Sequence, residues 1–301
     1  MRNEISPRET PWKLMPGVRV DYFSPIQKAY VAPRAGADYN LSSDTRLFTA
    51  GGIYYQPPQP QEDNSKFGNP DLDAPRAWHG KLGVDHDFRR GGSEGIEVSS
   101  GIFYRFFDQL VVQSTDFVVK NGVLQAERYN NKGKGRAYGL EALVKYNWHP
   151  FSGWLSYTLS RSERWSPGST IALFQFDQTH NANLVTQIEL PKNWQISSRF
   201  RYVTGTPYTP IEGGIFDADN DVYIPVRGPF FSKRLEDFFQ LDIRVDKKWA
   251  FDTWILSFYL DVQNVLNRRN IESIQYSYDY TQTANVAGLP ILPTLGVKGE
   301  F

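Results

Sequence analysis

The chain has 301 residues, with 33 Lys and Arg against 33 Asp and Glu, no Cys and 15% aromatic residues. Balanced charge argues against a nucleic-acid-binding surface, and the lack of Cys excludes disulfides, thiolate metal sites and cysteine catalysis. No apolar run reaches the ~18 to 20 residues of a membrane-spanning helix. The polar, proline-broken start from Met1 to Pro11 is not expected to be a signal peptide.

Alternation of apolar and polar residues predicts an all-β chain. In residues 237–249, for example, Phe239, Leu241 and Ile243 share one side while Asp242 and Arg244 share the other. About ten residues per strand is typical of membrane-spanning strands, whereas soluble strands average about five or six. In chain order, the predicted strands cover about residues 12–22, 31–40, 45–55, 77–88, 95–107, 137–148, 152–161, 179–190, 194–202, 237–249, 254–262 and 271–301, the last with the least defined start.

The connections between these strands alternate between short and long after the first one. In an antiparallel meander every second connection lies at the same end, so one end carries tight turns and the other carries long loops. This asymmetry is typical of outer-membrane barrels. The short turns are 41–44, 89–94, 149–152, 191–193 and 250–253; the long connections are 56–76, 108–136, 162–178, 204–236 and 267–290.

Tryptophans gather at the short-turn ends of the predicted strands, as expected of an aromatic belt at the headgroup level of a membrane. The alternative is a set of core anchors in a soluble β protein, although such a core would place them in mid-strand. The tryptophans concerned are Trp12, Trp148, Trp154, Trp194, Trp249 and Trp254.

Five segments carry a family resemblance: Phe176–His180, Arg201–Pro210, Gln240–Lys247, Asp261–Arg268 and Leu289–Phe301. They resemble the C-terminal half of the β-barrel of TonB-dependent outer-membrane receptors, and Asn264–Arg268 is the most characteristic stretch. The chain's final amphipathic strand, ending at Phe301, also resembles the signal by which outer-membrane barrels are recognised for assembly.

The resemblance implies an antiparallel up-and-down transmembrane barrel, in which residues 1–301 form one segment of about 12 of the family's 22 strands. It also implies a missing N-terminal plug domain, through which alone the energy-coupling protein TonB would act. Met1 is then expected to be an artificial or misassigned start, or the product of a split gene. Two unpaired edges, near residues 12–22 and 291–301, are expected, and the chain alone is not expected to transport.

In such receptors the extracellular loops and the plug hold the ligand, so aromatic residues of the long connections are the ligand candidates by resemblance. Packing of these loops on themselves is the alternative for each residue. The candidates are Tyr54, Tyr55, Trp165, Phe174, Phe176, Tyr208, Phe216, Tyr223, Tyr278 and Tyr280, with Phe107, Phe230 and Phe231 beside them.

No catalytic site, metal site or cofactor is predicted. The acidic loop Asp217–Asp221 departs from the calcium-binding pattern at Val222, where Gly is needed, and at Gly228, where Glu is needed. The four histidines lie singly on separate segments, and no serine nucleophile elbow is present. The basic run Lys132–Arg136 is interpreted as a solvated loop end, with binding of anionic lipopolysaccharide as the alternative.

The predicted function is uptake of a scarce nutrient, such as an iron chelate, by a non-enzymatic receptor in the cell outer membrane. Its expected partners are outer-membrane lipids and the barrel-assembly machinery, with no nucleic acid. Two alternatives stay open: a passive porin-like or adhesin barrel, and a soluble β-rich carbohydrate-binding protein. The sequence does not identify the ligand.

Overall fold

The structure is a computed structural model that describes residues 10–89, 92–120 and 122–300. Over these ranges it contains strands and turns only, so it has no helix that could cross a membrane. The strands are β1 (Trp12–Phe23), β2 (Lys28–Asn40), β3 (Thr45–Tyr55), β4 (Arg76–Asp87), β5 (Gly95–Lys120), β6 (Val123–Trp148), β7 (Phe151–Trp165), β8 (Ala172–Leu173), β9 (His180–Leu190), β10 (Trp194–Val203), β11 (Pro207–Tyr208), β12 (Ile211–Asp217), β13 (Val222–Arg227), β14 (Lys233–Arg234), β15 (Phe238–Ala250), β16 (Ile255–Gln263), β17 (Ile271–Tyr276), β18 (Thr283–Ala287) and β19 (Leu292–Glu300).

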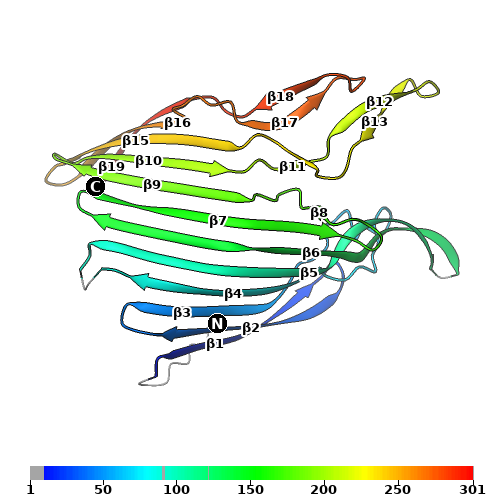
Figure 1. The fold of residues 1–301 in the computed structure, drawn as a ribbon, viewed down its shortest axis with the longest axis horizontal. Helices are drawn as coiled ribbons and strands as arrows, with labels where there is room; N and C mark the ends of the chain where they lie inside the picture. The colour runs from blue at the N-terminus through cyan, green and yellow to red at the C-terminus, as the bar shows by residue number, and fades with distance from the viewer. Residues whose placement is uncertain (1–9, 90–91, 121, 301) are drawn as a thin grey trace. The chain divides into compact units, whose positions relative to one another are not determined.

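One large sheet contains twelve principal strands at the predicted places, but the last, predicted over residues 271–301, is restricted to β19 (Figure 1). Its order follows the chain, β1-β2-β3-β4-β5-β6-β7-β9-β10-β15-β16-β19, with β8 added beside β7. Neighbouring strands are antiparallel, as the β1–β2 and β10–β15 registers show. The order ends at β1 and β19, each with one neighbour, so the described strands form an open sheet with the two edges that the sequence predicts.

The chain divides into two compact units. Unit one contains residues 1–85, 101–140 and 161–174, and unit two contains residues 86–100, 141–160 and 175–301. In unit one, the long connection after β3 is fixed by Asn131, whose amide donates to the Asp73 carbonyl at 2.9 Å and accepts from the Asp73 N–H at 2.8 Å. In unit two, β10 is paired along its full length with β9 on one side and with β15 on the other.

In each unit the sheet has one polar and one apolar face, because strand side chains alternate. In unit two the register places Phe200 opposite Leu241 on the apolar face and Arg199 opposite Asp242 on the polar face, where the two charges lie 2.8 Å apart. The polar face carries charges of both signs.

No second layer of protein covers the apolar faces in the part of the chain that the structure describes. Val18 in unit one is 69% exposed and Val297 in unit two is 70% exposed. Among the described residues, only Ile26, Ala32, Leu72, Ala74 and Val203 form a buried apolar set, which is far too small for a soluble core of this length. Apolar faces left open in this way fit contact with lipid and not a buried protein interior.

Three details differ from the sequence predictions. Residues 108–136, expected as a loop, continue β5 and β6 into a hairpin of two 26-residue strands, because backbone pairing persists where the apolar alternation stops. Four other pairs of short strands or strand extensions form within the long connections, including the hairpins β12–β13 and β17–β18. Trp154 lies opposite Val185 on the polar face, so it does not belong to a lipid-facing belt. Phe301 lies outside the described residues, whereas Leu295 and Val297 of β19 share the apolar face as expected.

Candidate ligand-binding site

A line of cationic and aromatic side chains crosses the polar face of unit one, and we call it the arginine–aromatic row. The guanidinium carbon of Arg34 lies 4.3 Å from the centroid of the Tyr54 ring, and Tyr54 stacks on His79 at 4.3 Å between ring centroids. The row consists of Arg34 in β2, Tyr54 in β3, His79 in β4, Phe107 in β5, Arg164 in β7 and Phe174 after β8.

The second half of the row is built around Arg164. Its guanidinium carbon lies 4.3 Å from the Phe107 ring centroid and 4.2 Å from the Phe174 ring centroid. His79 meets Phe107 edge to face at 6.4 Å between centroids. Because cations are attracted to aromatic faces, these contacts hold both guanidinium groups in place without an acidic partner.

Glycines let the two arginines lie close against the neighbouring strands. Gly52 is directly opposite Arg34, and a Cβ at Gly52 would lie 2.8 Å from Cγ of Arg34. A Cβ at Gly135 in β6 would lie 2.5 Å from Cδ of Arg164 and 2.8 Å from the carbonyl oxygen of Glu163. A glycine within a strand often marks such a close approach.

The row has cationic donors but no carboxylate. Within the part of the chain that the structure describes, neither Arg34 nor Arg164 lies within 4.0 Å of an acidic oxygen, and Nε of Arg34 is buried without a hydrogen-bond partner. Among the described residues, Arg164 donates to the Ser162 hydroxyl, at 3.2 Å, and to the Glu163 carbonyl, at 2.9 Å. Guanidinium groups without a paired carboxylate are suited to binding an anion.

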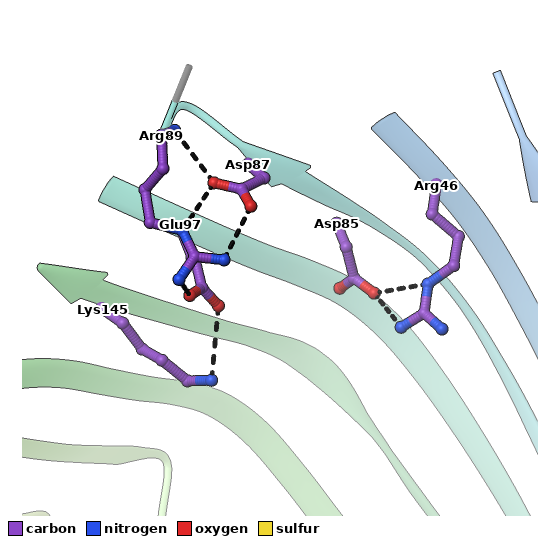
Figure 2. Close-up of polar contacts among 6 residues, drawn as sticks. All are labelled: Arg46, Asp85, Asp87, Arg89, Glu97 and Lys145. Atoms are coloured by element: carbon purple, nitrogen blue, oxygen red, sulfur yellow. Dashed lines mark hydrogen bonds and ion pairs between the residues drawn. The ribbon is translucent and has the colours of Figure 1, made fainter. Parts of the chain in front are cut away.

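Several other arginines on the sheet are paired with acids, whereas Arg105 and Arg201 lie over the rings of Phe103 and Phe238. In Figure 2, Arg89 lies between Asp87 and Glu97, with N···O distances of 2.7 and 2.6 Å, and Lys145 reaches Glu97 at 3.5 Å. In unit one, Arg46 binds Asp85, with 3.0 Å between Nε and Oδ2. Beside Arg89, a pocket of about 400 Å³ is lined by residues that include Trp154 and Gln187.

Three predicted ligand candidates instead pack on one another in unit two, and a fourth, Tyr280, packs on Tyr276 at 6.2 Å between ring centroids. The hairpins β12–β13 and β17–β18 lie side by side (Figure 1), and Tyr223 meets Phe216 at 5.1 Å and Tyr278 at 5.5 Å between ring centroids. The Tyr278 hydroxyl donates to the Asp221 carbonyl at 2.6 Å. We call Phe216, Tyr223, Tyr276, Tyr278 and Tyr280 the hairpin cluster.

The remaining candidates are scattered. Tyr55 packs on Tyr30 at 4.7 Å between centroids, Trp165 lies 6.0 Å from the guanidinium carbon of Arg136, and Tyr208 pairs with Lys233. Phe176 is exposed. The structure thus brings Tyr54 and Phe174 together with Phe107, and it adds Arg34, His79 and Arg164, which sequence reasoning did not select.

The segments that carry the family resemblance have structural roles in unit two. Arg234 forms an ion pair with Asp177, which is 1% exposed, and it also donates to the Gly205 carbonyl at 3.0 Å, so it joins two of the five segments. Asn264 accepts from the Arg268 N–H at 3.1 Å and donates to the Leu289 carbonyl at 3.1 Å. These contacts fix the bases of the long connections.

The sequence of this sheet matches one known protein family. A family model described as "TonB dependent receptor-like, beta-barrel" matches residues 2–265. The chain belongs to the TonB-dependent receptor β-barrel family. The resemblance inferred from the sequence is therefore confirmed, and the family and fold are those of receptor and transporter barrels. None of the curated proteins matches the chain significantly.

Solved structures of TonB-dependent receptors have the same fold. Similar chains include the ferric citrate transporter FecA in its unliganded form, with 18% identity and a TM-score of 0.64 over 96% of this chain and 43% of that one. The outer membrane transporter YddB from Escherichia coli has 14% identity and a TM-score of 0.69, with the same coverage. The ferripyoverdine receptor of the Pseudomonas aeruginosa outer membrane has 13% identity and a TM-score of 0.65, over 96% and 36%. The chain therefore spans less than half the length of these proteins.

Proposed function

We propose that the chain forms part of the barrel wall of an outer-membrane receptor that takes up an anionic iron chelate. The arginine–aromatic row carries this proposal, because Arg34 and Arg164 supply positive charge that no carboxylate in the described part of the chain neutralises. Nutrient uptake is the activity of the family's transporters, and two of the similar structures are named for ferric citrate and ferripyoverdine.

The chemistry of the row suits a ligand that carries carboxylate or catecholate oxygens around its iron. Each guanidinium offers several N–H donors in a plane, and the rings of Tyr54, Phe107 and Phe174 offer flat apolar surfaces beside them. The iron enters as cargo inside its chelate, so the protein contacts the chelating groups. Binding and orientation of that anion are the contribution of this chain.

The location and the partners belong to the same proposal. The open apolar faces fit outer-membrane lipids, and the amphipathic edge strand β19 would offer a contact to the barrel-assembly machinery. The open order from β1 to β19 fits a segment that acts with further strands and a plug, through which TonB would supply energy. Transport by the 301-residue chain alone is not expected.

Binding of defined iron chelates to the detergent-folded chain tests the row. Ferric citrate should quench the intrinsic tryptophan fluorescence saturably, and the R34Q/R164Q variant should bind at least about tenfold more weakly, because two charge-assisted contacts are lost. K298Q is the matched control, since Lys298 lies on the polar face of β19 and is paired with Glu300. Equal binding by the double variant, or equal binding of a neutral ferric hydroxamate complex by the parent chain, would contradict the proposal.

Fractionation of expressing cells tests the location separately. The chain should sediment with outer membranes and need detergent for extraction, because its apolar faces are uncovered. A chain that stays soluble without detergent contradicts the membrane location whatever the binding data show.

A further inference from the structure

A lysine occupies the apolar face of unit two near the short-turn end of β15. Lys247 lies directly opposite Trp194 in β10 and opposite Phe258 in β16, so its side chain shares the face of Val245 and Trp249. A charged residue at the lipid-facing centre of a barrel strand costs about 2–4 kcal/mol, but this cost falls to about 0–1 kcal/mol near the interface. Its position beside the short β9–β10 and β15–β16 turns places Lys247 at that interface.

Two indole rings enclose this lysine. Nζ of Lys247 lies 5.3 Å from the centroid of Trp194 and 5.4 Å from the centroid of Trp249, and it donates to the carbonyl of Lys192 in the β9–β10 turn. The lysine itself is only 9% exposed, whereas each tryptophan is 41% exposed. The ammonium is therefore held in one position while the outer parts of the rings stay open.

Lys247, Trp194 and Trp249 have hydrogen-bond donors that could bind an anion. Nζ has three donors, and within residues 10–89, 92–120 and 122–300 it has the Lys192 carbonyl as hydrogen-bond partner and no carboxylate within 4.0 Å. The indole N–H groups of Trp194 and Trp249 likewise have no protein partner within these ranges. One cation and two neutral donors on the same face, beside the short turns, match the oxygens of a phosphate.

We infer that Lys247, Trp194 and Trp249 form a binding site for the phosphate of an anionic phospholipid in the leaflet on the short-turn side. The lipid is favoured over a free phosphate ion because the donors lie on the apolar face, between Val245 and the turn, where acyl chains can follow the same strands. The phosphate oxygens accept from Nζ and the indole N–H groups, and the chains cover Val245 and Phe258.

Native mass spectrometry of the full chain, released from mixed micelles of phosphatidylglycerol and phosphatidylcholine, tests the site. The parent chain should retain phosphatidylglycerol selectively, and K247M should reduce that retention about fivefold, the effect of one lysine near a membrane surface. W249F, which removes one indole donor but keeps a ring, should give a smaller loss of about twofold. K298Q, on the polar face, should behave as the parent chain.

Different results of this experiment contradict the lipid site and the membrane location. Unchanged selectivity in K247M and W249F, or displacement of the lipid by millimolar inorganic phosphate, overturns the site as a lipid site. If K247M does not give the β-sheet circular dichroism of the parent chain, W249F decides. The inference rests on the proposed membrane location: a chain that retains neither lipid contradicts that location, whereas one that retains both equally contradicts only this site.

Discussion

The arginine–aromatic row and the hairpin cluster are both rich in aromatic residues, yet their polar groups differ. In the hairpin cluster the hydroxyl of Tyr278 donates to the Asp221 carbonyl, and the hydroxyl of Tyr276 accepts from the Ile211 N–H at 3.1 Å. In the row, Arg34 and Arg164 have rings and carbonyls around them but no acid among the described residues. Aromatic content therefore does not distinguish a binding surface from internal packing. The two regions differ in whether their polar and charged groups have protein partners.

The largest expected effect comes from breaking the ion pair between Arg234 and Asp177, in the same unit as the hairpin cluster. Asp177 is buried and bound to Arg234 at the base of the connection that carries β12 and β13. D177N should lower the free energy of unfolding by about 2 kcal/mol, because the half-buried guanidinium of Arg234 loses its charge partner while its carbonyl contacts remain. Urea unfolding in detergent measures this change. Binding of ferric citrate by the folded fraction should stay unchanged, and a loss of binding without a loss of stability would break the comparison.

A pair of glycine substitutions compares the two regions directly. G135A should weaken ferric citrate binding about tenfold, because the added methyl group would meet Arg164 and the Glu163 carbonyl and move the guanidinium from between its two rings. G213A in β12 is the matched control, since a Cβ there meets nothing within 4 Å. Titration of both variants with ferric citrate measures the difference. Equal affinities in the two variants would show that the position of Arg164 does not determine binding.

Acid should loosen the hairpin cluster slightly. Hydrogen bonds from Ser277 and Thr281 hold the pKa of Asp279, in the β17–β18 turn, below its ordinary value of 3.8. A carboxyl whose pKa is lowered by folding stabilises the fold above its ordinary pKa, and this contribution is lost as the pH falls through the folded value. Amide hydrogen exchange around residues 276–283, corrected for intrinsic rates, should quicken modestly below about pH 3.8. D279N should show no such pH dependence, and identical profiles for D279N and the parent chain would rule out this carboxyl as the cause.

The sequence predicts the sheet well because its signal is local. Alternation at a period of two marks each of the twelve principal strands, with boundaries close to the observed ones from β1 to β16. The outer halves of β5 and β6 are not predicted, because the apolar residues of 108–136 do not alternate consistently onto one side. Pairing with each other, and the contact of Asn69 with the Tyr129 carbonyl at 2.7 Å, hold them in strands instead.

The row could be predicted only in part. Tyr54, at the end of a predicted strand, and Phe174, in a long connection, were selected as aromatic residues, but Arg34, His79 and Arg164 lie in separate strands and interact only through the register and twist of the sheet. The one local signal was the presence of glycines at 52 and 135 within strands, which indicates close approach by a neighbour without identifying it.

The face of Trp154 was likewise decided by its pairing with Val185 and not by its place near a turn.

The β5–β6 hairpin has a consequence for anything that approaches the cell from outside. At roughly 3.3 Å per residue, a 26-residue strand extends about 85 Å, whereas the apolar band of an outer-membrane barrel is about 25 Å tall. In the proposed orientation most of this length stands clear of the bilayer, and its far portion carries exposed Phe117, Val119 and Leu124. In that orientation, anything that approaches the membrane from the side of the long connections meets this arm first.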